Sequence, residues 1–248
     1  MSGHNRWAKV KHVKAKTDAI KGKLFTKLIK ELTIAAKNGG GEVDTNASLR
    51  VAVQKAKDSN MPQDTIKKAI QRGTGELPGV SYEELMYEGY GPGGTALIVE
   101  VLTTNKNKAA AEIRRIFDRN GGKLAEQGAV SYMFNTKACI LVSSEKATED
   151  KLMEICLDAG AEDITLDGDT FEITGAPNTL EAIRTALDNA KIEVTSAEIT
   201  KISDTTIEVK GPDAEKMIKL QEALDEYEDV QNVYSNFDID EETMAALA

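Results

Sequence analysis

The segment Thr170-Phe-Glu-Ile-Thr-Gly175 is matched in pattern by Thr206-Ile-Glu-Val-Lys-Gly211. Each segment alternates apolar and polar residues and ends at a glycine, which predicts a strand followed by a turn. A helical pattern comes after each glycine, ending near Leu187 in the first case and near Leu224 in the second. The repeat therefore predicts a unit of strand, turn, helix and strand that occurs twice.

The elements counted outward from this repeat predict the fold. Residues 138–200 give strand–helix–strand–strand–helix–strand, the element order of a ferredoxin-like domain. The flanking residues 95–134 and 205–237 each give one strand–helix–strand half. We therefore expect an α+β protein with two ferredoxin-like α/β domains, the second inserted between the halves of the first. One continuous sheet is the alternative. Strands are expected at 95–103, 129–134, 138–143, 171–174, 193–200, 206–210 and 230–237, and helices at 106–119, 148–159, 178–190 and 213–227.

The first 75 residues carry a helical pattern instead. Apolar residues recur at helical spacing within 14–37, as one helix or two in line, and the glycines that follow end the pattern. Two further helices are expected at 46–58 and 62–72. The predicted domains are a basic helical nucleic-acid-binding domain at 1–78, a split α/β domain at 79–135 plus 204–248, and an inserted ferredoxin-like domain at 136–203.

Charge is divided very unequally along the chain. The formal net charge is −10, yet the first 75 residues hold 16 Lys or Arg against 6 Asp or Glu, and the remainder holds 15 against 35. The first 30 residues alone contain nine basic residues and one acid. A polyanion is attracted to the first part and repelled by the rest, so phosphate contacts are expected near the amino terminus.

Residues 3–16, which we call the basic arm, contain the only tryptophan, Trp7, next to Arg6. An aromatic ring beside a cation offers a stacking surface for unpaired bases; alternatively, Trp7 anchors the arm on the helical domain. Farther along, Lys23, Lys27 and Lys30 lie opposite the apolar side of the first helix, where they contact phosphates or simply face water. The predicted nucleic-acid-binding residues are Arg6, Trp7, Lys9, Lys11, His12, Lys14, Lys16, Lys21, Lys23, Lys27 and Lys30.

Two other segments are candidates for secondary contacts. Gly89-Tyr-Gly-Pro-Gly-Gly94 matches the letters of the dinucleotide fingerprint, but that motif follows a strand and opens a helix. Here a strand follows, so we interpret the segment as a tight turn or a loop that contacts a partner. Residues 105–108 end a strand and open a helix, where two lysines either hold a phosphate or face water. The secondary set is Tyr87, Tyr90, Gly91, Gly93, Gly94, Lys106 and Lys108.

Duplex DNA is an alternative ligand. Residues 46–72 are predicted to form helix, short turn and helix, the arrangement that places a recognition helix in a groove. The second helix turns polar residues outward, namely Thr65, Lys67, Lys68, Gln71 and Arg72.

Other function classes find little support. Cys139 and Cys156 lie in apolar stretches and are expected to be buried, and His4 and His12 lack zinc ligands at suitable spacing. No nucleophile or phosphate-loop motif occurs, no apolar run is long enough for a membrane span, and the acids at 225–229 are interpreted as a solvated helix surface. We expect a cytoplasmic protein, monomeric, with no catalytic residues, metal, cofactor, small-molecule substrate or membrane partner.

Several segments together resemble the signatures of the YebC family. The resemblance runs from residue 2 to about residue 240. It departs from the family pattern at Asn5, where serine is usual, and at Lys106 and Lys108, where arginines are usual. The segments that carry it are Ser2-Gly-His-Asn-Arg-Trp-Ala8, Lys11-His12, Gly22-Lys-Leu-Phe-Thr-Lys-Leu-Ile-Lys30, Asn60-Met-Pro62, Thr65-Ile66, Arg72-Gly-Thr-Gly75 and Tyr87-Glu-Gly-Tyr-Gly-Pro-Gly-Gly94.

The resemblance implies three domains, one helical and two α/β, and a non-enzymatic regulator of gene expression. Family members are described as DNA-binding transcriptional regulators or as ribosome-associated factors that ease translation through proline-rich stretches. Mitochondrial relatives are translational activators of a cytochrome oxidase subunit. We favour RNA and the ribosome, because an extended basic arm with a stacking aromatic suits unpaired or folded RNA. The acidic remainder of the chain would also disfavour a search along DNA. A DNA-binding transcriptional regulator is the alternative.

Overall fold

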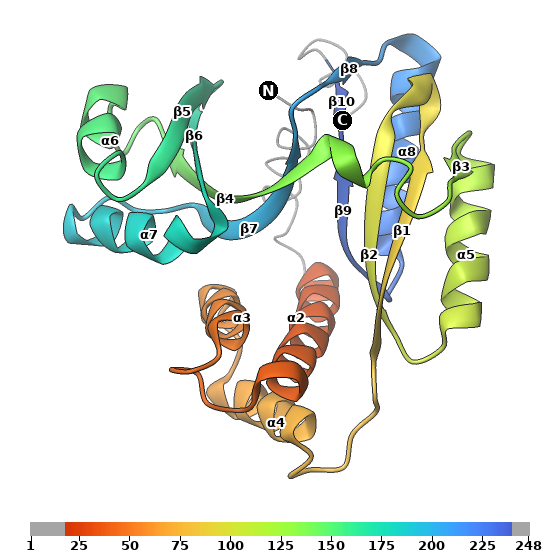
Figure 1. Cartoon of the computed structure of the whole chain (residues 1–248), viewed down its shortest axis with the longest axis horizontal. Helices are drawn as coiled ribbons and strands as arrows, with labels where there is room; N and C mark the ends of the chain where they lie inside the picture. The colour runs from red at the N-terminus through yellow and green to blue at the C-terminus, as the bar shows by residue number, and fades with distance from the viewer. Residues whose placement is uncertain (1–17, 240–248) are drawn as a thin grey trace. The chain divides into compact units, whose positions relative to one another are not determined.

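The computed structural model describes residues 18–239. Their contacts divide into two compact units, one of which holds residues 132–205 while the other holds the described residues before and after it. Helices come first along the chain and strand-rich sheets follow (Figure 1). The predicted α+β class is therefore confirmed. The finer division into three domains stays a prediction. The amino-terminal helices are α2 (Asp18–Gly39), α3 (Ala47–Asp58) and α4 (Gln63–Thr74).

A small apolar core joins α2, α3 and α4. Leu32, Leu49 and Ala69 contribute one fully buried side chain from each helix. Helices α2 and α4 approach closely at Gly73, where an added Cβ would lie 2.3 Å from the backbone oxygen of Thr33. A glycine is therefore needed at this crossing, because any side chain would force the helices apart.

The connection between α2 and α3 is organised by Asn46, which is buried. Its Oδ1 accepts a hydrogen bond from the backbone N–H of Leu49, which caps the start of α3. Its Nδ2 donates to the backbone oxygens of Ala35 and Gly40 at the end of α2. One side chain thus ends the first helix and begins the second.

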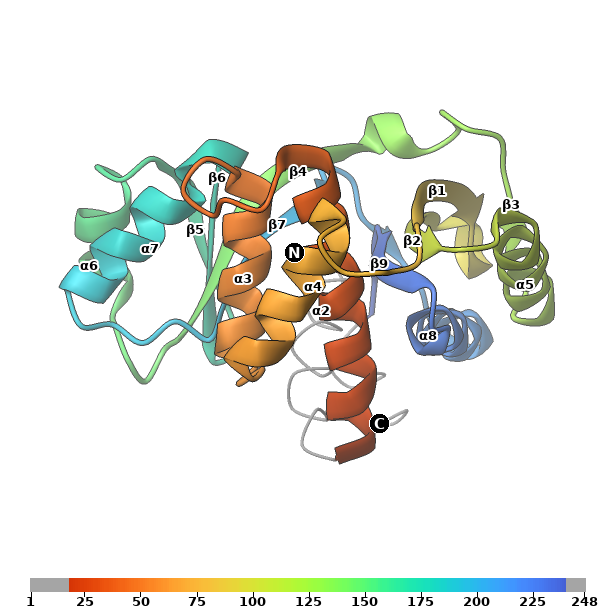
Figure 2. The same cartoon turned by 90° about the horizontal axis from the view of Figure 1, so that it is seen from below.

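The rest of this unit is a four-stranded sheet in the order β3-β1-β2-β9, and its neighbouring strands are antiparallel. Helices α5 and α8 lie side by side along one face (Figures 1 and 2). Val99 of β2, Phe117 of α5 and Leu220 of α8 are fully buried between these layers. The elements are β1 (Glu83–Tyr90), η1 (Pro92–Gly94), β2 (Ala96–Thr103), α5 (Lys106–Arg119), β3 (Lys123–Leu124), β8 (Ile207–Glu208), α8 (Gly211–Glu226), β9 (Val230–Ser235) and β10 (Phe237–Asp238). The short helix η2 (Ser131–Met133) lies where the chain passes from this unit to residues 132–205.

Three strands of this unit differ from the prediction. β1 is absent from the predicted strands, yet it pairs with both β2 and β3. The strand expected at 129–134 does not form, since η2 lies in that stretch. The strand that follows α5 is instead β3, which has two residues and comes earlier in the chain. The strand expected at 206–210 shrinks to β8, which pairs in parallel with β10 outside the four-stranded sheet. An upstream segment, β1, therefore completes the sheet.

Residues 132–205 form the other unit, with the element order β4-α6-β5-β6-α7-β7 and the antiparallel sheet order β5-β6-β4-β7. This is a ferredoxin-like arrangement, in which the first and third strands are central. Ile140 of β4, Ile173 of β6 and Ile183 of α7 are fully buried. The elements are β4 (Phe134–Ser143), α6 (Glu149–Cys156), β5 (Ala161–Asp167), β6 (Thr170–Gly175), η3 (Pro177–Thr179), α7 (Leu180–Asn189) and β7 (Ser196–Ser203).

Candidate nucleic-acid interface

Most of the predicted nucleic-acid-binding residues lie outside the described part of the chain. Lys21 is in α2, but its side chain is not described, and Lys23, Lys27 and Lys30 are the predicted contacts whose side chains can be placed. Those outside residues 18–239 are Arg6, Trp7, Lys9, Lys11, His12, Lys14 and Lys16.

The three placed lysines differ in burial along α2. Lys23 is exposed, as are its neighbours Gly22, Leu24 and Thr26, whereas the first buried side chain is Leu28 and burial is continuous from Leu32 to Ala36. The first turns of α2 therefore extend beyond the helical core, as the red helix in Figure 2 shows. This start of the helix presents Lys23 to solvent directly after the basic arm in sequence.

Lys27 is half-buried, and its Nζ donates to the backbone oxygen of Asp225 at 3.1 Å. Lys30 is 6% exposed. Its ammonium donates to the backbone oxygens of Leu102 (3.3 Å) and Glu228 (2.8 Å) and to Oδ1 of Asp229 (2.7 Å). An ammonium has three donors, and these bonds use all of them. The prediction that Lys30 contacts phosphate is therefore wrong, because α2 packs against the sheet on this side.

Asp229 is the centre of this buried contact. Its Oδ2 accepts from the hydroxyl of Thr103 at 2.9 Å and from that of Tyr227 at 3.4 Å. Burial, followed by the charge of Asp229, raises the pKa of Tyr227 to about 12, so the phenol remains a donor at neutral pH. The interpretation of residues 225–229 as a solvated surface is thus incorrect for Asp229. Its ion pair with Lys30 spans 199 positions, a separation that local sequence patterns do not reveal.

The predicted secondary contacts do not form one site. Gly91, Gly93 and Gly94 precede β2, whereas Lys106 and Lys108 follow it. A strand of this length separates its two ends by roughly 20–25 Å at ~3.3 Å per residue. The set must therefore be divided into a glycine turn and a helix start.

The glycine turn connects β1 to β2 as a hairpin. Gly93 and Gly94 adopt positive φ angles of 72° and 77°, which favour glycine. An added Cβ at Gly91 would lie 2.6 Å from Oγ1 of Thr95, so this position is closely packed. No helix beyond the three-residue η1 opens here, and the geometry is that of the predicted tight turn into a strand.

The two tyrosines of the secondary set are tied to the fold. Tyr87 packs against the core between the sheet and its helices, and burial raises its pKa. Tyr90 is more exposed, and its hydroxyl donates to the backbone oxygen of Ala129 at 3.2 Å.

Glu88 lies between these tyrosines and was not among the predicted functional residues. It is 2% exposed; Oε1 accepts from the N–H of Gly128 at 2.7 Å, and Oε2 from those of Val130 (2.7 Å) and Ser131 (2.9 Å). Burial on its own would raise the pKa of Glu88. The hydrogen bonds from the backbone lower this pKa by more than burial raises it, so it lies below the usual value of a glutamate. The carboxylate therefore holds the loop after β3 on the sheet. The sequence feature that could have identified Glu88 is its position as the one acidic residue within a glycine-rich motif.

The helix start after β2 is capped by Asn105, whose Oδ1 accepts from the backbone N–H of Lys108 at 3.1 Å. Lys106 is exposed, and Nζ of Lys108 lies 3.9 Å from Oε1 of Glu228. Both side chains of this pair are mostly exposed, so the pair is weak.

Helix α4 presents a second basic surface. Ile66 and Ala69 face the helical core, whereas Lys67, Lys68 and Arg72 are exposed. The other outward residues of the prediction, Thr65 and Gln71, are half-buried.

Within residues 18–239, no group of three or more His, Cys, Asp or Glu side chains is placed to hold a metal ion. No helix in the same stretch is both long enough and apolar enough to cross a membrane. Cys139 and Cys156 are both buried, and burial raises the pKa of Cys156 to about 11, which keeps this thiol protonated.

Comparison with known proteins identifies the family. Residues 5–76 match the TACO1/YebC protein N-terminal domain, and residues 82–237 match the TACO1/YebC second and third domain. The chain belongs to the TACO1/YebC family.

Two relatives are each named probable transcriptional regulatory protein. The protein from Dictyoglomus turgidum is 51% identical over 249 residues and covers 100% of both chains. The one from Desulfatibacillum aliphaticivorans is 52% identical over 244 residues, which cover 98% of this chain and 99% of the relative. The crystal structure of the conserved hypothetical protein Aq1575 from Aquifex aeolicus is also similar. Its sequence identity is 40% and its TM-score is 0.83, with 92% of this chain and 94% of that chain covered.

Proposed function

We propose that this chain is a non-enzymatic regulator of gene expression that binds RNA on the ribosome, in the cytoplasm, and eases translation of difficult stretches such as proline-rich ones. The basic arm and the exposed start of α2 make the contact. The observation that carries this proposal is the charge division, since nine of the first 30 residues are basic while the chain beyond residue 75 has a large excess of acids. A polyanion attracts the amino-terminal end of such a chain and repels the rest, so the chain would bind through that end.

The described part of α2 supports this orientation. Lys23 is exposed on a helix start that extends beyond the core, and Lys30 anchors the same helix to the sheet seven residues later. The anchor holds the helix start in a fixed position within its unit. The helix start, which directly follows the basic arm in sequence, is therefore held in place, and this favours binding to a structured polyanion such as a ribosomal particle.

DNA binding by α4 is the second candidate. It is favoured by the exposed Lys67, Lys68 and Arg72, which follow a helix and a short turn, and by the names of the relatives. The two candidates use different basic surfaces, so charge-neutralising variants distinguish them.

Binding to purified ribosomes and to a DNA duplex would be measured for two variants of the full chain. One variant replaces Lys9, Lys11, Lys14 and Lys16 by Gln, and the other replaces the three basic residues of α4. We expect the arm variant to lose ribosome cosedimentation while the α4 variant retains it. If about six phosphates are engaged, log K against log salt should slope about −4 for single strands. Loss of binding only in the α4 variant, together with a shifted duplex at physiological salt, would establish the transcriptional alternative.

The substitution Trp7→Ala tests the stacking role within the arm. Loss of a stacked base costs about 1–3 kcal/mol of RNA binding, with little change in melting temperature. If Trp7 instead anchors the arm on the helical core, the melting temperature falls by several degrees, because truncating a buried aromatic costs about 3–5 kcal/mol.

A further inference from the structure

Beyond residue 75 the chain is acidic, with one exception at residues 105–123. The whole of this part has 15 Lys or Arg against 35 Asp or Glu, yet residues 105–123 hold six of the cations and two of the acids. These residues comprise the cap of α5, the helix itself, the turn that follows it and β3 (Figure 1). A local excess of cations within an acidic chain marks a place that a polyanion can approach.

Several cations of this region are available to a ligand. Four of them are exposed and have no hydrogen bond or ion pair within residues 18–239, namely Arg114, Arg119, Lys123 and Lys216. Of the two acids in the stretch, Asp118 is exposed, whereas Glu112 accepts from Nε of Arg115 at 2.9 Å and is thereby compensated. The four exposed cations therefore keep their N–H donors for phosphate oxygens.

Three of these cations lie around the turn between α5 and β3. Arg119 is the last residue of α5, and Lys123 is the first residue of β3. An added Cβ at Gly121 would lie 3.5 Å from Cδ of Lys216, so the stem of this lysine of α8 packs beside the turn. Two helices and a strand thus contribute one cation each to the same place, which local sequence patterns do not reveal.

An exposed aromatic ring lies beside Lys123. Tyr90 is opposite Lys123 in the antiparallel pairing of β1 with β3, so both side chains lie on one face of the sheet, with Cβ atoms about 5 Å apart. Tyr90 is 38% exposed, and the bond from its hydroxyl to the backbone of Ala129 holds the ring in place. A fixed aromatic ring beside an ammonium is suited to bind an unpaired base together with its phosphate.

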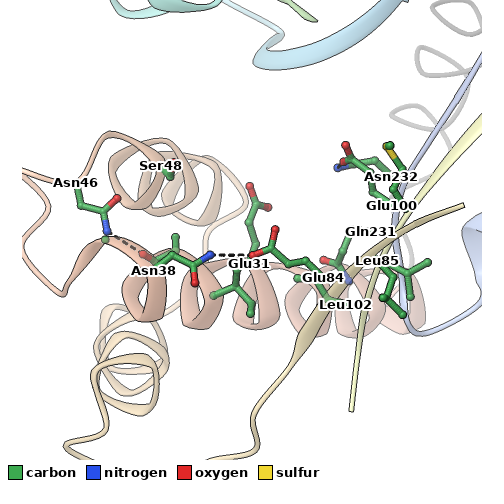
Figure 3. A pocket seen from close by; sticks show the side chains of 15 residues that line it. Glu31, Asn38, Asn46, Ser48, Glu84, Leu85, Glu100, Leu102, Gln231 and Asn232 are labelled. Carbon is green, nitrogen blue, oxygen red and sulfur yellow. Dashed lines mark hydrogen bonds between the residues drawn. The ribbon is translucent and has the colours of Figure 1, made fainter. Parts of the chain in front are cut away.

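The other end of β1 is unsuitable for a polyanion. Glu84, near the start of this strand, lines a groove between α2 and the sheet together with Glu31 and Glu100, as Figure 3 shows. These carboxylates repel phosphate groups, so a strand of RNA is directed to the end of β1 where Tyr90 and Lys123 lie.

We propose that the end of α5, β3 and the adjacent Tyr90 form a second RNA-binding surface, which takes an unpaired segment of RNA. Its phosphates lie against Arg119, Lys123 and Lys216, and one of its bases stacks on the ring of Tyr90. This role rests on the proposed function, because its ligand is RNA, but it uses none of the residues of the basic arm or α2. Two contacts on one RNA particle raise the affinity above that of either contact alone.

The test uses the full chain in which Lys9, Lys11, Lys14 and Lys16 are replaced by Gln, so that the remaining binding reports the second surface. The probe is a 5′-fluorescein-labelled uridine 12-mer, followed by fluorescence anisotropy in 100 mM salt. Adding Arg119→Gln and Lys123→Gln should weaken binding about 25-fold, because two phosphate contacts at ~0.7 each in log K per decade of salt are lost. The difference should vanish in about 1 M salt.

The matched control adds Lys146→Gln and Lys151→Gln to the same parent, which removes two exposed lysines from residues 132–205, and should change the affinity less than about twofold. Because all four substituted positions are exposed, the melting temperature should stay within about 2 °C of the parent in both variants. Equal weakening in the two variants would indicate bulk charge and overturn the second surface.

Two substitutions of Tyr90 test the stacked base. Tyr90→Leu removes the ring and should weaken RNA binding about five- to 150-fold, the range that one stacked base contributes. Tyr90→Phe keeps the ring, loses only the hydroxyl and should stay within about twofold of the parent. Equal loss in both variants would overturn the stacking contact.

The remaining outcomes separate this surface from the proposed function. If the unmodified chain binds the RNA but the parent with the neutralised arm does not, the second surface is refuted and the arm accounts for the binding. If the unmodified chain does not bind RNA, the proposed function fails as well. A DNA duplex of 12 base pairs is the comparison ligand. Weaker binding of the duplex by the Arg119 and Lys123 variant, with RNA binding unchanged, would assign the surface to DNA and overturn the proposal.

Discussion

Replacement of Lys30 by Met should destabilise the unit that contains α2, and the size of the effect follows from the contacts of the ammonium. Met keeps most of the length of the side chain but removes three hydrogen bonds and the positive charge. Asp229, whose side chain is 14% exposed, then keeps a negative charge with only two neutral donors, Thr103 and Tyr227. Removal of one partner from a buried pair costs about 3–5 kcal/mol. We expect the lower end, about 3 kcal/mol, because these donors remain.

The destabilisation would be measured by thermal unfolding followed by circular dichroism. At about 2–4 °C per kcal/mol for 150–250 residues, the melting temperature should fall by about 6–12 °C. Lys23→Met is the matched control, since it makes the same substitution at an exposed position of the same helix and should cost less than about 0.5 kcal/mol. Hydrogen exchange should increase in α2 and β9 but not in residues 132–205, which form the other unit.

A double-mutant cycle with Asp229→Asn would complete the test. The two side chains form an ion pair with a 2.7 Å contact, so their effects should be non-additive by about 1–3 kcal/mol. Additive effects, or a Lys30→Met protein that melts like the wild type, would refute the structural role. Unchanged stability with loss of ribosome binding would instead return Lys30 to the nucleic-acid interface.

Three further predictions concern single residues. Because the pKa of Glu88 is lower in the folded protein, this residue stabilises the fold above about pH 4.5, and the stabilisation is lost as the pH falls through the folded pKa. When the free energy of unfolding in urea is measured against pH, Glu88→Gln should therefore reduce its loss at acid pH. An unchanged curve would contradict this. Gly73→Ala should cost at least about 1–3 kcal/mol in the same assay, because its Cβ collides with α2, whereas Gly22→Ala, which meets nothing within 4 Å, should stabilise by about 0.5–1 kcal/mol. Asn46→Ala should cost about 1–2 kcal/mol through the lost cap, and an unchanged midpoint would contradict it.

The elements with strong local periodicity could be predicted from the sequence. The helix expected at 106–119 has the same bounds as α5, and those at 46–58 and 62–72 differ from α3 and α4 by one or two residues. Each of these helices buries one face only, so its apolar residues recur at the helical spacing of 3.6 residues and can be recognised in the sequence. The class of the fold followed from the order of these elements.

β1 could not be predicted because its residues contradict the usual signal for a strand. Its sequence includes three glutamates and a glycine, with no regular alternation. Burial of Glu88 is compensated by backbone N–H groups from a loop about 40 positions farther along the chain. Gly89 is required because an added Cβ would lie 2.6 Å from the ring of Phe117. Both explanations depend on long-range contacts, which composition and spacing do not encode.

The lysines of α2 show the same limit at the candidate interface. Lys23 and Lys30 are seven residues apart, which is two helical turns, so they lie on the same side of the helix. The sequence presents one basic stripe, but the sheet covers its later part, and Ile34 one turn beyond Lys30 is buried as well.

A simultaneous change of Lys23, Lys27 and Lys30 to Glu would place a carboxylate beside Asp229 and unfold this side of the unit. It could not test phosphate binding. Lys23→Glu alone, at an exposed site with similar helix propensity, reverses the charge without breaking the anchor. Weaker ribosome binding by this variant, with an unchanged melting temperature, would show that only the exposed part of the stripe contacts phosphates.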